Sequence, residues 1–319
     1  MSRYDQLFAR LGERHEGAFV PFIMLSDPDP VTALRIVRAA VAGGADAVEL
    51  GVPFSDPVAD GPTIQASHIR ALANGATVDA ALDQVRQIRH EFSELPIGML
   101  IYGNVAFTRG LENFYTQFHD AGADSILLPD VPVRESAPFT SAAAAAGIEP
   151  IYIAPARASE ATLRGVAEHS TGYIYAISRD GVTGTEKESE TQGLGGVVNN
   201  VKRFGGAPVL LGFGISTPEH VAQAIAAGAA GAITGSALTK IIDAHLDEEG
   251  RPEDTLIQAV SDYVSSMKAA TLPGYTLAEV SRETLALRLT GATAASASAM
   301  PIQKAPSHSR EGARVSRET

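Results

Sequence analysis

The stretch AGGADAVELG (residues 42–51) has the pattern of a helix end, a glycine cap and a short apolar strand. The same order recurs in AGADSILLPD (121–130), AGIEPIYIAP (146–155) and AGAAGAITGS (227–236). Each copy marks a point where a helix gives way to a buried strand. The repetition therefore predicts a chain built from successive strand and helix units.

Working outward from these junctions, we expect eight strands, with amphipathic helical stretches such as Pro30–Val41 and Pro218–Ala226 between them. The strands are expected near residues 19–24, 47–51, 97–102, 125–129, 149–153, 173–177, 208–212 and 231–234. Strands such as PIGMLIY and APVLLGF are almost wholly apolar, as parallel strands covered on both faces are. Eight such units predict a (β/α)8 TIM barrel, whereas the alternative, a doubly wound sheet, lacks the GxGxxG expected after its first strand.

Two terminal segments differ from the repeat. The first residues, MSRYDQLFARLGERHEG, are charged and helix-like, and predict an extra N-terminal helix. Residues 271–319 contain a run of small residues and many polar ones, and are expected to be a disordered C-terminal extension with at most one weak helix at Leu277–Leu289. The predicted catalytic barrel domain therefore spans residues 1–270.

The bulk composition excludes several classes of function. With 319 residues, 45% of them hydrophobic, the chain can bury a large core. A net charge of -12 argues against a nucleic-acid partner. The absence of cysteine excludes disulfides and thiolate chemistry. Because the sequence has no signal-peptide pattern and no apolar run of bilayer length, we expect a cytoplasmic protein without a membrane partner.

Polar residues at the carboxyl ends of barrel strands are the first candidates for chemistry. Glu49 lies inside the second strand, between Val48 and Leu50. Burying a carboxylate there is costly and raises its pKa, which favours a group that exchanges a proton near neutral pH. The alternative is a structural Glu paired with a buried Arg or a backbone amide.

The loop PFSDPVADGPTIQ follows that strand. Its prolines fix the backbone and so hold Asp56 and Asp60 in place at a low entropic cost. For either aspartate alone a turn-capping role is as plausible, and Asp60 is placed to cap the next helix.

Glycine-rich loops follow the sixth, seventh and eighth expected strands: GVTGT (181–185), GFGIS (212–216) and GS (235–236). In barrels these positions form phosphate sites from backbone N–H groups and a helix N-terminus. The long polar segment SRDGVTGTEKESETQG is typical of a lid. No lysine falls on an expected strand and no histidine falls at a strand end, so neither a Schiff base nor a metal site is expected.

The motifs PFSDPVADGPTIQ, LIYGN, YIYAISRDGVTGT, LGFGIS and AITGSALTK occur in this order, and the chain closely resembles the tryptophan synthase alpha chain family over about residues 1–270. It departs from common family usage at Pro129 and at SDPDP (26–30). The resemblance implies a lyase of tryptophan biosynthesis, which cleaves indole-3-glycerol phosphate to indole and glyceraldehyde 3-phosphate without a metal or a cofactor of its own.

The resemblance also implies site residues. Glu49 is then the acid and base of the cleavage, and Asp60 binds the indole N–H. The expected substrate-binding residues are Phe22, Leu100, Tyr102, Leu127, Ile153, Tyr175 and Thr183, and the expected phosphate-binding residues are Gly184, Gly214, Gly235 and Ser236.

The family works with a pyridoxal-phosphate beta chain in an alpha2beta2 tetramer, which receives the indole. By this resemblance Pro53 and Asp56 contact that partner. Two alternatives remain open at this point: a phosphosugar isomerase, which the glycine loops alone would also suit, and a non-catalytic activator of the beta chain.

Overall fold

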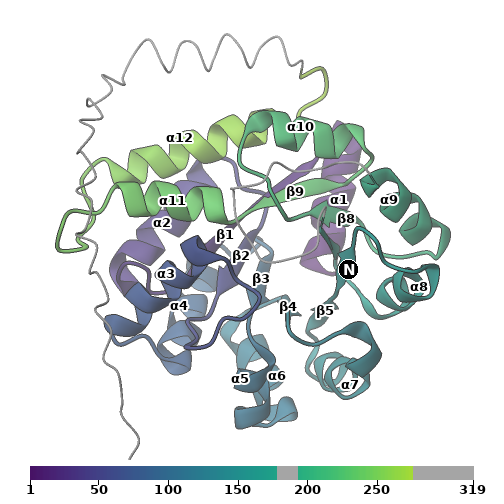
Figure 1. Ribbon diagram of the computed structural model, residues 1–319, viewed down its shortest axis with the longest axis horizontal. Helices are drawn as coiled ribbons and strands as arrows, with labels where there is room; N and C mark the ends of the chain where they lie inside the picture. The colour runs from purple at the N-terminus through teal and green to yellow at the C-terminus, as the bar shows by residue number, and fades with distance from the viewer. Residues whose placement is uncertain (178–192, 276–319) are drawn as a thin grey trace, which may run out of the picture. The chain divides into compact units, whose positions relative to one another are not determined.

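The computed structural model describes residues 1–177 and 193–275. Two predictions therefore lie outside the described residues: the lid within 178–192, and the helix at Leu277–Leu289 with the rest of the extension beyond residue 275. The described part of the chain is a barrel of parallel strands surrounded by helices (Figure 1).

The strands pair in the order β5-β4-β3-β2-β1-β9-β8-β7-β6. Both ends of this order belong to one extended segment, because only Tyr152 separates β5 from β6. The backbone N–H of Tyr175 donates a 3.2 Å hydrogen bond to the carbonyl of Tyr152, so the chain itself completes the ring. The predicted TIM barrel is confirmed, and the fifth expected strand is observed as the two pieces β5 and β6. The strands are β1 Ala18–Met24, β2 Val48–Gly51, β3 Ile97–Leu100, β4 Ser125–Leu127, β5 Glu149–Ile151, β6 Ile153–Pro155, β7 Ile174–Ile177, β8 Val209–Leu211 and β9 Gly231–Thr234.

The helices of the described residues fill the connections between strands and cover the outside of the ring. Several begin where the sequence places a cap or a proline, as α2 does with Asp29 capping and Pro30 in its first turn. They are α1 Arg3–Arg14, α2 Pro30–Ala42, α3 Pro62–Ala73, α4 Val78–Glu91, α5 Gly103–Arg109, α6 Leu111–Ala121, α7 Ala137–Ala146, α8 Glu160–His169, α9 Leu194–Arg203, α10 Pro218–Ala226, α11 Ser236–Ala244 and α12 Leu256–Ala269, with a 3-10 turn at Val133–Glu135. In residues 1–177 and 193–275, none of them is long and apolar enough to cross a membrane.

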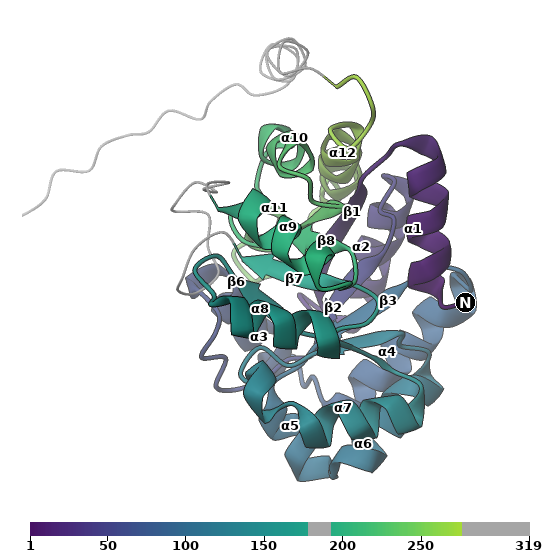
Figure 2. The same ribbon diagram turned by 90° about the vertical axis from the view of Figure 1, so that its right-hand side faces the viewer.

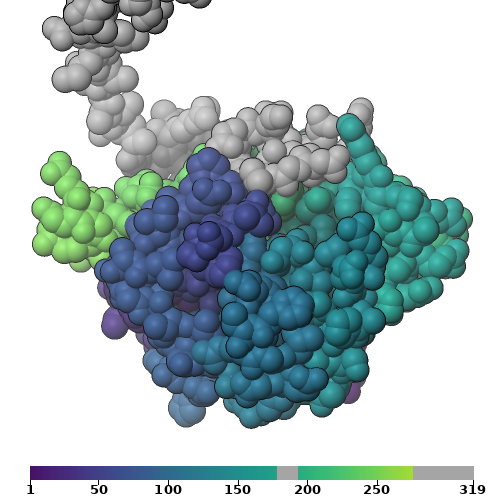
Figure 3. All heavy atoms as spheres, turned by 60° about the horizontal axis from the view of Figure 1, so that its bottom comes forward, coloured from purple at the N-terminus to yellow at the C-terminus, as the bar shows by residue number. Residues whose placement is uncertain are grey.

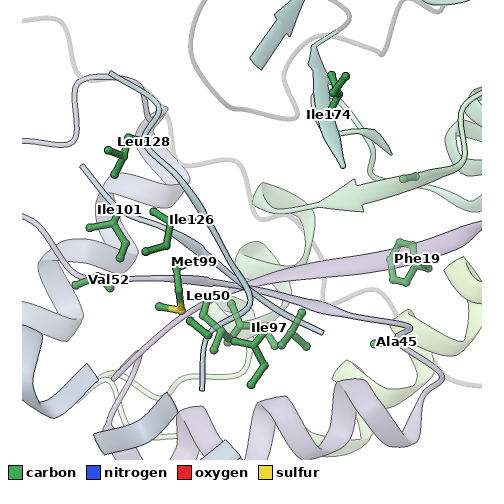
Figure 4. Close-up of a cluster of buried hydrophobic side chains, with 14 of the residues drawn as sticks. Phe19, Ala45, Leu50, Val52, Ile97, Met99, Ile101, Ile126, Leu128 and Ile174 are labelled. Carbon is green, nitrogen blue, oxygen red and sulfur yellow. The ribbon is translucent and has the colours of Figure 1, made fainter. Parts of the chain in front are cut away.

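Side chains of the strands alternate between two apolar layers. Residues such as Leu50, Met99 and Ile126 point outward and pack against the surrounding helices (Figure 4). Residues at the alternate positions of the strands and just before them, among them Ala47 and Leu127, belong to a separate cluster inside the barrel. Position in a strand therefore decides whether a side chain reaches the helices or the barrel interior.

The extra N-terminal helix closes one end of the barrel. Ser2 and Asp5 form a capping box that starts α1, which stands beside the strands in Figure 2. Tyr4, Leu7 and Leu11 of this helix join the interior cluster. The opposite end, where the strands finish, is left for the loops that carry the predicted site.

The residue that follows the last helix region also contacts the barrel. Helix α12 ends at Ala269, and the carbonyl of Thr271, which is buried, accepts a hydrogen bond from the backbone N–H of Gly17 at 3.0 Å.

Candidate active site

Glu49 faces the inside of the barrel. Its neighbours Val48 and Leu50 pack against the helices, so the alternation along β2 directs the Glu49 side chain to the interior. In the sheet register it lies opposite Phe22 on β1 and Gly98 on β3. The side chain is almost wholly buried.

The two carboxyl oxygens of Glu49 have different surroundings. Oε1 accepts a 2.9 Å hydrogen bond from the hydroxyl of Tyr173. Oε2 is buried and has no hydrogen-bond partner among the described residues. Burial raises the pKa of Glu49 to about 7, the hydrogen bond from Tyr173 opposes that rise, and the charge of Asp60 adds to it. A carboxyl group with this pKa can both give and take a proton near neutral pH. The structural alternative, a pairing with Arg or a backbone amide, is not what the described residues form.

Asp60 lies on the loop between β2 and α3 and is 5% exposed. The hydroxyl of Tyr102 donates to its Oδ2 at 2.7 Å, and Nε2 of His68 lies 3.2 Å from the same oxygen. Burial and the charge of Asp60 raise the pKa of Tyr102, so its hydroxyl keeps the proton that it donates. The alternative in which Asp60 caps the next helix is wrong, because the N-cap of α3 is Gly61.

The rest of this loop divides into a buried and an exposed part. Pro53 is buried, and the ring of Phe54 stacks on Tyr102 with 5.2 Å between ring centroids. Asp56 is exposed, and its carboxylate accepts a hydrogen bond from the hydroxyl of Ser55. Figure 3 looks onto a face of the molecule where the blue atoms of the segment between β2 and α3 lie at the surface.

Glu49 and Asp60 line one cleft at the end of the barrel. Its inner part is narrow, about 30 Å³, and is lined by Glu49 and Asp60 together with Gly214, Gly235 and Ser236. Its outer part has a volume of about 500 Å³ and a mostly apolar lining. The two parts share Asp60, Leu100, Tyr175 and Phe213. The outer volume is in the range that binds small organic molecules.

The structure brings most of the predicted site residues to this cleft. Phe22 lines the inner part, Leu127 and Ile153 line the outer part, and Leu100 and Tyr175 line both. Tyr102 contacts the site through the hydrogen bond that its hydroxyl donates to Asp60. Thr183 and Gly184 lie outside the described residues.

The predicted phosphate residues Gly214, Gly235 and Ser236 line the inner part of the cleft. Gly214 has a positive φ of 76°, which an L-residue rarely adopts. Ser236 is the first residue of α11, and Gly235 is its N-cap. The N-terminus of a helix offers unpaired N–H groups and a partial positive charge to an anion. The described ranges hold no group of three or more His, Asp or Glu side chains that could bind a metal ion.

Two residues around the carboxyl groups were missed from the sequence. Tyr173 precedes β7 and has the same parity as Tyr175, so the alternation of a strand could have placed it inside the barrel. His68 lies in the middle of α3, away from any strand end. Its contact with Asp60 depends on how the loop folds back over the helix, and no local pattern signals it.

Comparisons with known proteins point to one family. Residues 8–271 match the family model described as tryptophan synthase alpha chain. A tryptophan synthase alpha chain from Corynebacterium aurimucosum is 80% identical over 271 residues, which cover 85% of this chain and 98% of that protein. The crystal structure of tryptophan synthase subunit alpha from Legionella pneumophila has a TM-score of 0.75 at 32% identity, covering 85% of this chain and 98% of that one. A crystal structure of a tryptophan synthase complex from Pyrococcus furiosus has a TM-score of 0.69 at 32% identity, covering 80% and 98%.

Proposed function

The chain belongs to the tryptophan synthase alpha chain family, and we propose from that premise which of its residues carry the reaction. The reaction is the cleavage of indole-3-glycerol phosphate to indole and glyceraldehyde 3-phosphate. The bond that breaks joins C3 of the indole ring to the adjacent carbon of the glycerol chain, which carries a hydroxyl group. Family membership favours this lyase over the phosphosugar isomerase that glycine loops alone would allow.

Glu49 is the proposed acid and base. As an acid it transfers its proton to C3 of the ring, which leaves a positive charge on the indole nitrogen. The glycerol hydroxyl then gives its proton to Glu49, the carbon–carbon bond breaks, and its electron pair returns to the ring. One proton is given and one is taken back, so Glu49 is restored. The pKa of about 7 and the buried Oε2 of Glu49 support both steps.

Asp60 is the proposed electrostatic partner of the ring. Its carboxylate accepts the indole N–H and stabilises the positive charge that develops there after C3 is protonated. The observation that carries the whole proposal is that Glu49 and Asp60 line one cleft in different environments. One carboxyl is held by a single tyrosine inside the barrel, and the other receives its donors at the mouth of the barrel. Such a difference is how two carboxyl groups take different roles.

The remaining predicted residues are proposed to bind the substrate. Phe22, Leu100, Leu127, Ile153 and Tyr175 surround the indole ring, while Tyr102 acts through Asp60. Gly214, Gly235 and Ser236 hold the phosphate with backbone groups, and Ser236 adds its hydroxyl. Thr183 and Gly184 are proposed to complete the site from the segment outside the described residues.

The chain is proposed to work in the cytoplasm with a beta chain, as an alpha2beta2 tetramer in which pyridoxal phosphate belongs to the beta chain. The complex from Pyrococcus furiosus supports an assembly of this kind. Pro53 and Asp56 are proposed to contact the beta chain, and the exposure of Asp56 and of Val58, which is 74% exposed, supports a contact on this loop.

The test is release of indole from indole-3-glycerol phosphate by the wild-type chain, by Glu49→Gln and by Asp60→Asn, each with and without a beta chain. We expect cleavage by the wild type and a loss of at least about 100-fold in kcat for Glu49→Gln, which has no proton to exchange. Cleavage by Glu49→Gln at the wild-type rate would refute the proposed role of Glu49. Equal activation of the beta chain by all three proteins, with no cleavage by any, would instead support the non-catalytic alternative.

A further inference from the structure

His68 contacts the loop between β2 and α3 at two points: the backbone of Phe54 near its start and the carboxylate of Asp60 near its end. We propose that His68 is a positioning residue for Asp60: its neutral imidazole, held as the Nε2–H tautomer by the loop backbone, donates the hydrogen bond that orients the Asp60 carboxylate for the indole N–H. This inference rests on the function proposed above for Asp60. The contact of His68 itself is a property of the ligand-free chain and can be tested without substrate.

The tautomer of His68 follows from its two contacts. The backbone N–H of Phe54 donates to Nδ1 at 3.0 Å. A ring nitrogen that accepts a hydrogen bond carries no proton, so the proton of the neutral ring is on Nε2. Nε2 lies 3.2 Å from Oδ2 of Asp60 and is therefore the donor of that pair. With Nδ1 occupied as an acceptor, the ring cannot be a doubly protonated cation, and the contact is a hydrogen bond of a neutral histidine to a carboxylate.

The side chains of His68 and Asp60 are both buried where they meet. The His68 side chain is only 2% exposed, and that of Asp60 is 7% exposed. Water therefore competes little for either group, and a hydrogen bond to a charged acceptor is strengthened in such surroundings. The orientation of Asp60 then depends on which protein donors reach it.

Tyr102 forms a second link of the same kind. Its hydroxyl accepts from the backbone N–H of Ala59 at 3.0 Å and donates to Oδ2 of Asp60 at 2.7 Å. His68 and Tyr102 thus each take a hydrogen bond from the loop backbone and pass one to the same carboxylate oxygen. Both donors therefore depend on the folded conformation of residues 54 to 60, so loop order and the orientation of the Asp60 carboxylate are coupled.

The position of His68 is fixed by the anchoring of helix α3. Ser67, the preceding residue, donates to the buried carboxylate of Asp27, and Arg70 donates to both oxygens of that carboxylate, at 2.8 and 2.9 Å. These contacts tie the middle of α3 to the turn after β1. An imidazole on a helix held in this way can set the position of a carboxylate on a neighbouring loop.

Two substitutions separate the two contacts of His68. His68→Asn places an amide near the position of Nδ1, where it can still accept from Phe54, but the side chain is too short to reach Asp60. His68→Gln places an amide near the position of Nε2, where it can still donate to Asp60. If His68 had a purely structural role, both substitutions or neither would lower the activity.

The first measurement is the steady-state cleavage of indole-3-glycerol phosphate by the folded variants. We expect His68→Asn to lower kcat about 10- to 100-fold with a smaller change in KM, because the misoriented carboxylate matters most when charge develops on the ring. His68→Gln is expected to stay within about threefold of wild type. The matched control is Ile69→Asn, which introduces the same residue at a 68% exposed position of α3 and should retain the wild-type kcat and KM. Equal losses in His68→Asn and His68→Gln, or a wild-type kcat in His68→Asn, would overturn the inference.

The second measurement reads the tautomer directly. In a long-range ¹H–¹⁵N correlation spectrum of the ligand-free chain, His68 should show a protonated Nε2 and an unprotonated Nδ1. Its signals are identified by their loss in the His68→Asn spectrum. An Nδ1–H tautomer or a cationic ring would refute the inference even if the enzyme cleaves its substrate. A wild-type chain that releases no indole would refute the proposed function, while this spectrum would still decide the contact of His68.

Discussion

Tyr173 and Glu49 lie 124 residues apart in the chain, and the hydroxyl of Tyr173 donates a 2.9 Å hydrogen bond to Oε1 of Glu49. Both side chains are buried inside the barrel, where burial raises the pKa of each. The raised pKa keeps Tyr173 protonated, so that it remains a donor at any pH at which the enzyme works. The pKa of Glu49 is therefore raised by burial and by the charge of Asp60, and lowered by this donor.

Replacing Tyr173 by Phe removes the donor and leaves the burial. The hydrogen bond stabilises the charged form of Glu49, so its loss should raise the pKa of Glu49 above about 7. The limb of the pH profile of kcat/KM that falls with rising pH should move to higher pH, because Glu49 then stays protonated up to a higher pH. The measurement is indole release across about pH 5 to 9. Tyr115→Phe, at an equally buried tyrosine of α6, is the control and should leave the limb in place. A limb that stays in place or moves to lower pH in Tyr173→Phe would contradict the assignment.

Replacing Glu49 by Gln should stabilise the fold at high pH. The folded-state pKa of Glu49, about 7, lies above its unfolded value of 4.5, so the folded state binds the proton more tightly. The contribution of Glu49 to stability is fully present below about pH 4.5 and is lost as the pH rises through about 7. Gln carries no such penalty and can still accept from Tyr173. We expect the free energy of unfolding of the variant to exceed that of wild type by about 3 kcal/mol at pH 9 and to match it at low pH.

Urea titrations of both proteins at several pH values measure this difference. The sign is the decisive feature. A variant that is less stable than wild type at high pH would mean that Glu49 is held charged by its surroundings, contrary to its burial.

The fold followed from the sequence because its signal is local and repeated. Each helix-cap-strand junction, such as that at residues 42–51, identifies one unit without knowledge of the others, and alternation within the strand then directs Glu49 inward. The same alternation, applied to the expected strand at 173–177, would have directed Tyr173 inward together with Tyr175. Alternation could place the site residues on strands, whereas the role of Asp60, which lies on a loop, came from the resemblance to the family.

His68 and Asp27 could not be found in this way. His68 reaches Asp60 because the loop folds back over α3, and Asp27 pairs with Arg70 although 43 residues separate them. Both contacts depend on the packing of one segment against another, which periodicity within a segment does not report. The unusual turn SDPDP (26–30) was visible in the sequence, but its role in anchoring α3 was not.

Removing the Asp27 carboxylate should destabilise the barrel. Asp27 is 1% exposed and binds Arg70 through both oxygens, while Arg70 reaches the more exposed Asp243 with its remaining nitrogen. Asp27→Ala leaves the guanidinium partly buried with only that exposed partner, at a cost of about 3 kcal/mol. Chemical denaturation measures the loss. The matched control is Asp79→Ala, which breaks an Arg–Asp pair with Arg109 whose carboxylate is 79% exposed, and should cost less than about 1 kcal/mol. Equal costs for the two variants would show that the buried pair adds nothing beyond a surface pair.

Substitution of Asp56 tests whether the loop between β2 and α3 serves both catalysis, through Asp60, and contact with the beta chain, through Asp56. Its carboxylate is exposed and accepts from the neighbouring Ser55, whereas Asp60, four residues later, is buried in the cleft. Asp56→Ala should therefore leave the activity of the isolated chain within about twofold of wild type, because a surface charge of this kind contributes little to its own fold. Activation by a beta chain should fall about 3- to 10-fold, as expected when one charge at the rim of an interface is removed. Cleavage assays with and without a beta chain measure both quantities, and Glu13→Ala, at an exposed acid on α1 at the other end of the barrel, should change neither. Parallel loss of both quantities in Asp56→Ala would place this carboxylate in the catalytic set with Asp60 rather than at the contact with the partner.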